Sequence, residues 1–113
     1  MNFEERPWGS YTILYSSASC QVKKLVVNPN KRLSLQSHQY RAEHWFIVSG
    51  SGLVQIDSSN LEVSQGDSVD IPIGFKHRIS CISTTPLVFI EVQTGTSFDE
   101  KDIVRYEDDF GRS

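Results

Sequence analysis

The sequence predicts an all-β fold, either a sandwich or a barrel, formed by a single domain. Short runs rich in Val, Ile, Leu, Tyr and Phe recur along the 113 residues, and turn-favouring residues separate them. Between these runs, no long stretch repeats its apolar residues with the period of a helix. Regular short strands without intervening helices are typical of antiparallel sandwiches and barrels. A chain of this length buries one hydrophobic core, so we expect one domain over residues 1–113.

Eight segments have the composition and length of strands, and the breaks between them contain Gly, Pro, Asn or Ser. The predicted strands are Tyr11–Tyr15, Gln21–Val27, Leu33–His38, Trp45–Val48, Leu53–Asp57, Ser68–Ile71, His77–Ile82 and Leu87–Gln93. After Gly95 the character of the sequence changes, and Phe98–Arg105 is dense in charged residues. We expect this segment to form a turn or two of helix, so the prediction is an all-β domain with a short C-terminal helical tail.

The composition excludes several classes of partner. Hydrophobic residues make up 38% of the chain and charged residues 22%, which is ordinary for a globular protein. The net charge of -3 gives no electrostatic reason to expect nucleic acid or an anionic membrane as partner.

The N-terminus has acidic residues where a signal peptide would be basic and apolar, so we expect a cytoplasmic protein. Cys20 and Cys81 lack a zinc or redox spacing, and we expect both to be free thiols.

Four polar side chains lie at the ends of predicted strands and could meet at one point. Gln36 and His38 are two residues apart, so they share one face of a strand. Glu43 begins the next strand, and His77 begins another directly after a turn that contains Pro72 and Gly74. Two imidazoles, a carboxylate and an amide form a ligand set that suits a divalent transition metal. We therefore expect Gln36, His38, Glu43 and His77 to hold one metal ion.

The ligand types restrict the metal without fixing it. Mixed nitrogen and oxygen ligands without cysteine fit zinc first, and manganese, iron, cobalt or nickel as alternatives. His44 is adjacent to Glu43, so on a strand its side chain faces the opposite side. We expect His44 to pack or to form hydrogen bonds outside the metal site.

The spacing of these residues resembles the two motifs of cupins. Gln36 to Gly50 follows the pattern polar-x-His-x4-Glu-x6-Gly, and Gly66 to His77 follows Gly-x5-Pro-x-Gly-x2-His. The strings Leu33-Ser-Leu-Gln-Ser-His38 and Arg41-Ala-Glu-His-Trp45 are more specific, and they resemble the cupin domain of type II phosphomannose isomerases. The resemblance extends over about residues 6–112. It implies a cupin fold, that is, a double-stranded β-helix or jelly-roll-like barrel.

The resemblance also implies an activity and a set of site residues. In that family the domain usually follows a mannose-1-phosphate guanylyltransferase domain, and its activity is the interconversion of mannose 6-phosphate and fructose 6-phosphate. The chain has no glycine-rich loop for phosphates, so we expect no guanylyltransferase activity. The family match makes Lys23 a residue of the cavity and Arg112 a catalytic arginine of the tail. The other implied residues are Glu91, which is catalytic if it faces the cavity, and Arg6 and Arg41, which either bind phosphate or form exposed salt bridges.

Two other functions stay open at the level of sequence. The first is a non-catalytic cupin that binds a sugar or a sugar phosphate and has kept its metal. The second is an iron cupin dioxygenase, although Gln36 at the first histidine position argues against it. In each case the expected partner is a small molecule, and by analogy with other cupins we expect a homodimer.

Overall fold

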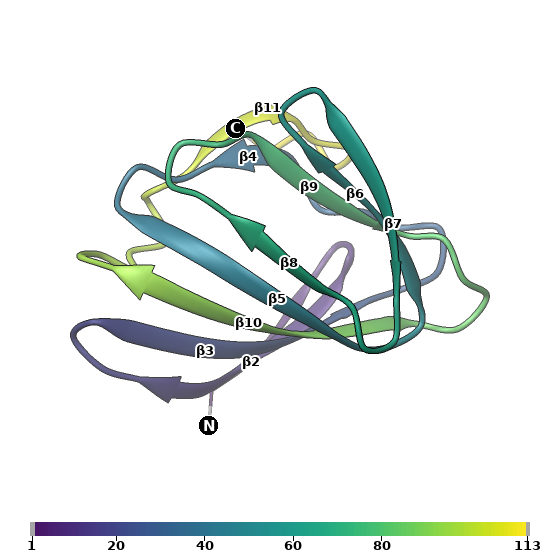
Figure 1. Ribbon diagram of the computed structural model, residues 1–113, viewed down its shortest axis with the longest axis horizontal. Coiled ribbons are helices and arrows are strands. Elements are labelled where there is room, and N and C mark those ends of the chain that lie inside the picture. The colour runs from purple at the N-terminus through teal and green to yellow at the C-terminus, as the bar shows by residue number, and fades with distance from the viewer. Residues whose placement is uncertain (1, 113) are drawn as a thin grey trace.

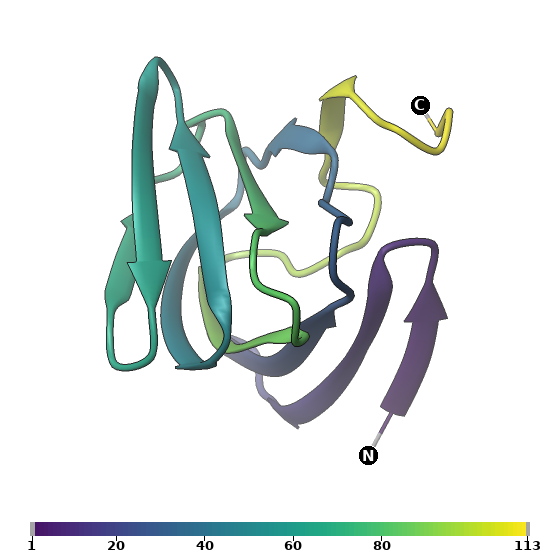
Figure 2. The same ribbon diagram turned by 90° about the vertical axis from the view of Figure 1, so that its right-hand side faces the viewer.

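The computed structural model describes residues 2–112, and its strands form two antiparallel sheets that face each other (Figure 1). The strands are β1 (Asn2–Arg6), β2 (Gly9–Ser16), β3 (Cys20–Val27), β4 (Leu35–Ser37), β5 (Arg41–Ser49), β6 (Ser51–Ile56), β7 (Ser59–Ser64), β8 (Ser68–Ile71), β9 (His77–Cys81), β10 (Leu87–Gly95) and β11 (Val104–Glu107). One sheet has the order β1-β2-β3-β10-β5-β8, and the other has the order β11-β4-β9-β6-β7. Both orders bring together strands far apart in sequence. Figure 2 shows the two layers and the β1–β2 hairpin that extends from one of them.

The inward face of the larger sheet changes from apolar to polar along its central strands. On β5 the buried positions run from Arg41 and Glu43 to Trp45 and Ile47, and the side chains between them are more exposed. The antiparallel β10 places Phe89 opposite Ile47, Glu91 opposite Trp45, and Gln93 opposite Glu43. Apolar residues therefore gather at one end of the space between the sheets and buried polar residues at the other. The polar end is where the candidate site lies.

The predicted all-β class is correct, and the predicted helical tail is wrong. All eight predicted strands occur, although β4 is shorter than the predicted segment at Leu33–His38. Residues 99–102 form a single turn, in which the Asp102 amide donates to the Asp99 carbonyl at 2.9 Å. The chain then pairs with β4 as β11. A helix of one or two turns leaves most of its backbone N–H and C=O groups without hydrogen-bond partners and is not stable by itself. Pairing with β4 gives backbone groups of this segment hydrogen-bond partners in a sheet.

The three strands that the sequence did not predict are β1, β7 and β11, and each lies at the edge of a sheet. Most of their residues are exposed, so their sequences lack the alternation of apolar and polar residues that marks a half-buried strand. Within residues 2–112 there is no helix with the length and apolar character needed to span a membrane.

Candidate metal centre

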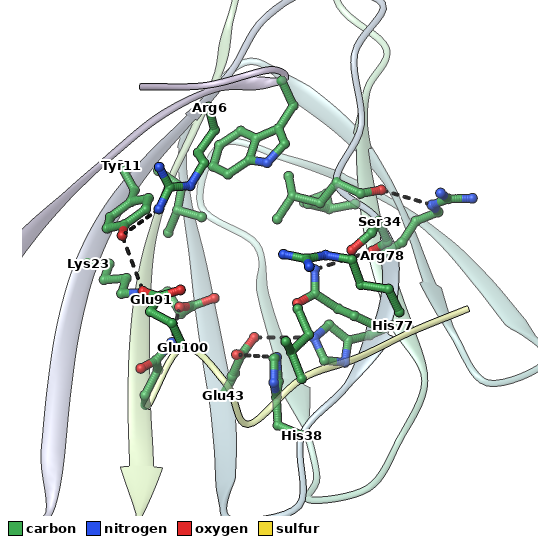
Figure 3. Close-up of a pocket in the computed structure, with 18 of the residues that line it drawn as sticks. Arg6, Tyr11, Lys23, Ser34, His38, Glu43, His77, Arg78, Glu91 and Glu100 are labelled. Carbon is green, nitrogen blue, oxygen red and sulfur yellow. Dashed lines mark hydrogen bonds and ion pairs between the residues drawn. The ribbon is translucent and has the colours of Figure 1, made fainter. Parts of the chain in front are cut away.

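Two histidines and a glutamate converge at the polar end of the fold (Figure 3). His38 follows β4, Glu43 lies on β5 and His77 begins β9. The His38 Nε2 atom lies 3.2 Å from Glu43 Oε2, and the His77 Nε2 atom lies 3.5 Å from Glu43 Oε1. All three side chains are buried, with only 3–4% of their surface exposed. Strand ends from both sheets thus bring the three groups to one point.

Each histidine has its other ring nitrogen fixed by a backbone carbonyl. The His38 Nδ1 atom lies 2.6 Å from the carbonyl oxygen of Asp102, and the His77 Nδ1 atom lies 3.0 Å from that of Phe75. A carbonyl oxygen only accepts hydrogen bonds, so each Nδ1 carries the proton and donates it. In the neutral ring, each Nε2 then directs a lone pair toward the Glu43 carboxylate.

This donor set fits a divalent cation. Lone pairs and a carboxylate that face one another in a buried site are unfavourable unless a cation lies between them. Fixing Nδ1–H with a carbonyl is also how proteins commonly orient metal-binding histidines. Burial lowers the pKa of His77 and favours its neutral ring. Burial opposes ionisation of Glu43, but its interactions with His38 and His77 outweigh burial and lower its pKa, which favours the carboxylate.

Gln36 and His44 occupy different surroundings. Gln36 lines the same pocket as the three cluster residues and lies opposite His77 in the β4–β9 register. Its Nε2 atom donates to the Ser34 carbonyl at 3.3 Å, so its amide is oriented by its own strand. His44 points outward, as strand alternation predicts, and its Nδ1 atom lies 2.6 Å from Asp70 Oδ1 on the exposed surface.

The pocket around the cluster concentrates positive charge, although the whole chain has a net charge of -3. Its basic lining residues are Arg6, Lys23, Arg41, Arg78, Arg105 and Arg112, and its carboxylates are Glu43, Glu91 and Glu100. Six cations against three carboxylates leave a local excess of positive charge before any metal ion is counted. A pocket of this kind favours an anionic ligand.

Lys23 lies inside the pocket and belongs to a connected polar cluster. Its Nζ atom lies 3.4 Å from Glu100 Oε1, and the Tyr11 hydroxyl donates to the same oxygen at 3.2 Å. The guanidinium of Arg6 donates to the Tyr11 hydroxyl at 3.2 Å. Burial and the nearby charge of Glu100 raise the pKa of Tyr11 to about 12, so the phenol keeps its proton. Figure 3 shows this cluster on the wall of the pocket opposite His77.

Glu91 faces the cavity, which decides between the two positions that the sequence left open. It is 5% exposed and lies opposite Lys23 in the β3–β10 register. Trp45 Nε1 donates to its Oε2 atom at 3.0 Å, and Gln93 Nε2 donates to its Oε1 atom at 2.6 Å. Burial, and next the charge of Glu43, raise the pKa of Glu91. The pocket therefore holds a fixed carboxylate that keeps a proton more readily than an ordinary glutamate.

The two remaining predicted site residues, Arg41 and Arg112, line the pocket and have acceptors on nearby segments. Arg41 is buried, with Nη1 donating to the Asp99 carbonyl at 3.1 Å and Nε lying 3.7 Å from Glu43 Oε2. Arg112 is partly exposed, and its Nε and backbone amide both donate to Asp108 Oδ2, at 2.8 and 2.7 Å. The tail thus returns to the pocket, as expected, but by way of a strand and not a helix.

Several pocket residues were not identified from the sequence. Arg105 lies opposite Gln36 in the β4–β11 register, and Glu100 belongs to the segment between β10 and β11. Asp102, in the same segment, contacts the ring of His38 through its carbonyl. Nothing in the local sequence shows that this segment returns across the pocket. Arg78 also lines the pocket, and its position directly after His77 gave no signal, because adjacent residues of a strand face opposite sides.

Comparisons with known proteins identify the family of the chain. Residues 3–108 match the family model described as "Mannose-6-phosphate isomerase C-terminal". The chain is 44% identical over 108 residues to xanthan biosynthesis protein XanB of Xanthomonas campestris pv. campestris, covering 96% of this chain and 23% of XanB. It is 39% identical over 107 residues to mannose-1-phosphate guanylyltransferase ManC of Salmonella typhimurium, covering 95% of this chain and 22% of ManC.

Solved structures show the same fold at low identity. The capsular polysaccharide assembling protein CapF of Staphylococcus aureus superimposes with a TM-score of 0.80 at 24% identity, covering 94% of this chain and 34% of CapF. Oxalate decarboxylase of Lactobacillus farciminis superimposes with a TM-score of 0.80 at 22% identity, covering 93% of this chain and 33% of the decarboxylase. The chain spans only 22–23% of the length of the curated relatives cited here. The family match covers nearly the whole chain, which therefore belongs to the mannose-6-phosphate isomerase C-terminal family, a family of cupin domains.

Proposed function

We propose that this chain is a metal-dependent isomerase that interconverts mannose 6-phosphate and fructose 6-phosphate. One observation supports it most: a buried cluster of two histidines and a glutamate opens into the same pocket as six basic side chains. A metal ligand set and a cationic wall suit a metal-dependent isomerase that acts on a sugar phosphate. The family description of the matching model names the same substrate.

The basic side chains would hold the phosphate of the substrate. Arginine presents several N–H donors in a plane and suits phosphate oxygens, as do lysine ammonium groups. Arg105 and Arg112 lie near each other at the pocket, and burial followed by the charge of Arg112 lowers the pKa of Arg105. A bound dianion would relieve that repulsion. We assign phosphate binding to this side of the pocket, which includes Arg6, whose charge also lowers the pKa of Arg105. Arg41 lies beside the metal cluster.

The reaction moves a proton between C1 and C2 of the sugar, so the pocket needs a group that takes and returns it. We assign that role to the Glu91 carboxylate, which lines the pocket and is held by Trp45 and Gln93. Lys23, opposite Glu91 in the register, would donate to a sugar oxygen and stabilise negative charge as it develops. His38, Glu43 and His77 would hold the metal ion, with Gln36 as a further oxygen ligand. When bound, a divalent metal polarises the carbonyl as a Lewis acid.

A coupled assay on zinc-loaded protein tests the proposal. Mannose 6-phosphate should be converted to fructose 6-phosphate, and free mannose should react much more slowly because it offers nothing to the basic wall. Glucose 6-phosphate and ribose 5-phosphate, tested in parallel, measure selectivity among sugar phosphates. Binding of mannose 6-phosphate without conversion, in protein whose metal content is verified, would favour the non-catalytic alternative. Conversion that is equally fast for mannose and mannose 6-phosphate would contradict the assigned phosphate site.

A further inference from the structure

The two histidines of the cluster are fixed in different ways. The carbonyl that accepts from His77 belongs to Phe75, only two residues earlier in the chain. The carbonyl that accepts from His38 belongs to Asp102, which is 64 residues away and lies between β10 and β11. The position of the His77 proton is therefore set by a local turn, whereas that of the His38 proton depends on how the chain returns over the pocket.

Asp102 forms three hydrogen bonds to three consecutive residues. Besides the His38 contact at 2.6 Å through its carbonyl, its Oδ1 atom accepts from the Gln39 amide at 2.9 Å. Its Oδ2 atom accepts from the Tyr40 amide at 3.0 Å. The two side-chain oxygens of Asp102 thus accept from backbone amides in the connection between β4 and β5. Its backbone oxygen accepts from the ring of His38, the first residue of the same connection. An ionised carboxylate that accepts two backbone N–H groups is a strong anchor.

The segment that contains Asp102 is attached to both walls of the pocket. Its Asp99 carbonyl accepts from Arg41 on β5, beside the metal cluster, and its Glu100 carboxylate accepts from Tyr11 and Lys23 on the opposite wall. These contacts place the Asp102 carbonyl from both sides. A 2.9 Å backbone hydrogen bond closes the turn between Asp99 and Asp102. This turn holds Asp102 at a short, fixed distance from the residues that anchor Asp99 and Glu100.

We propose that Asp102 is a positioning residue for the metal centre. Its carboxylate fixes the connection between β4 and β5, and its carbonyl keeps the His38 proton on Nδ1, so that the Nε2 lone pair is directed at the metal. Without this hold, His38 can place its proton on Nε2 and donate it to Glu43, which satisfies both groups without a metal ion. This inference rests on the metal site of the proposed function, but not on the reaction assigned to it.

Metal affinity is the first test. The zinc dissociation constant, measured by competition with a chromophoric chelator in the absence of substrate, should rise about 10–100-fold in Asp102→Ala, the range for loss of a group that orients a ligand. Asp102→Asn should fall between this variant and the wild type, because it keeps one acceptor. Asp99→Ala is the matched control: it removes one negative charge from the same segment, and its carboxylate accepts from the Lys101 amide. Equal dissociation constants for Asp102→Ala and Asp99→Ala would overturn the proposal.

The position of the His38 proton is the second test, and its main measurement is made on the wild type. The chain has three histidines, so a long-range ¹H–¹⁵N spectrum of the 12.8 kDa protein can be assigned in full. At pH 8, metal-free wild-type protein should show His38 as the Nδ1–H form, because its Nδ1 atom lies 2.6 Å from the Asp102 carbonyl oxygen. In Asp102→Asn, His38 should show a mixture of forms while His77 stays unchanged. An Nε2–H form in the wild type would overturn the proposal even if the variants fold poorly.

The outcomes also separate this inference from the proposed function. If the wild type binds zinc as the inference requires but does not convert mannose 6-phosphate, the proposed function fails and the role of Asp102 stands. If turnover is normal and the variants bind zinc like the wild type, the proposed function stands and Asp102 has no such role. A purely structural role would lower the melting temperature of metal-free Asp102→Ala without changing the zinc dissociation constant measured at low temperature.

Discussion

The two walls of the pocket are built from different parts of the chain. The metal wall comes from β4, β5 and β9, with its ligands at strand ends joined by short connections. The opposite wall joins residues near the N-terminus, such as Arg6 and Tyr11, to the segment after β10, so that Tyr11 binds Glu100 across 89 residues of sequence. Strand alternation and turn length therefore set the metal wall, whereas the second wall depends on the whole fold. If the walls have separate roles, a change on one wall should leave the function of the other intact.

The largest effect is expected from the metal wall. His38→Ala and Glu43→Ala should each lose most of the bound zinc in elemental analysis and nearly all turnover, because removal of a Lewis acid costs several kcal/mol of transition-state stabilisation, on the order of 10³-fold or more. His44→Ala is the control and should keep both, since its side chain points outward. Full zinc occupancy in the first two variants would show that the ion binds elsewhere.

A change on the second wall should affect turnover and leave the metal in place. We expect Arg112→Ala to lower kcat/KM. The drop should correspond to about 2–4 kcal/mol of lost transition-state stabilisation, the range for loss of one donor that stabilises transition-state charge. Deletion from Asp108 onward should act in the same direction. Lys101→Ala removes a positive charge from the neighbouring exposed segment and should change kcat/KM little. If Arg112→Ala loses zinc as readily as His38→Ala, the two walls are not independent.

The glycines of the two sequence motifs should differ in their effect on stability. Gly50 and Gly66 both have positive φ angles, of 81° and 91°. A Cβ on Gly50 would lie 2.6 Å from the Pro86 carbonyl oxygen, whereas a Cβ on Gly66 would meet nothing within 4 Å. Gly66→Ala should therefore cost about 1 kcal/mol of backbone strain. Gly50→Ala adds a steric clash and should cost roughly 2–4 kcal/mol.

Urea unfolding of both metal-free variants measures these costs on one scale. Similar losses of unfolding free energy would mean that the β5–β6 connection shifts to make room for the new methyl group. In that case Gly50 would matter for its φ angle alone, as Gly66 does.

The smallest effect concerns the attachment of the tail. The hydrogen bond from Arg112, against the opposing effect of burial, lowers the pKa of Asp108 from its ordinary value of 3.8 to about 2. Because the folded-state pKa is the lower one, this pair adds stability that is complete above about pH 4 and is lost as the pH falls toward 2. After solvent screening at Arg112 we expect a contribution on the order of 1 kcal/mol. The difference in unfolding free energy between the wild type and Asp108→Asn should shrink over that range, and a constant difference would contradict the assignment.

The contrast between the walls also explains what could be predicted from the sequence. The fold class followed from the regular spacing of the strands. The positions of His38, Glu43 and His77 followed from motif spacing, because strand alternation and short turns place each of these side chains relative to its own strand. The edge strands β1, β7 and β11 were missed, since mostly exposed strands lack the apolar pattern. The roles of Glu100, Asp102 and Arg105 were missed for a different reason: the pairing of β11 with β4 is a long-range event that leaves no periodic trace.

Transfer of the substrate proton is the most direct test of the proposed isomerase activity. Zinc-loaded wild-type protein, with its metal content verified, is incubated with mannose 6-phosphate in D₂O and followed by NMR. Fructose 6-phosphate should form with deuterium at C1, because Glu91 takes the C2 proton and can exchange it with solvent before returning it. Glu91→Gln with the same zinc content should form far less product. Unchanged, unlabelled mannose 6-phosphate in the presence of fully loaded wild-type protein would contradict the account.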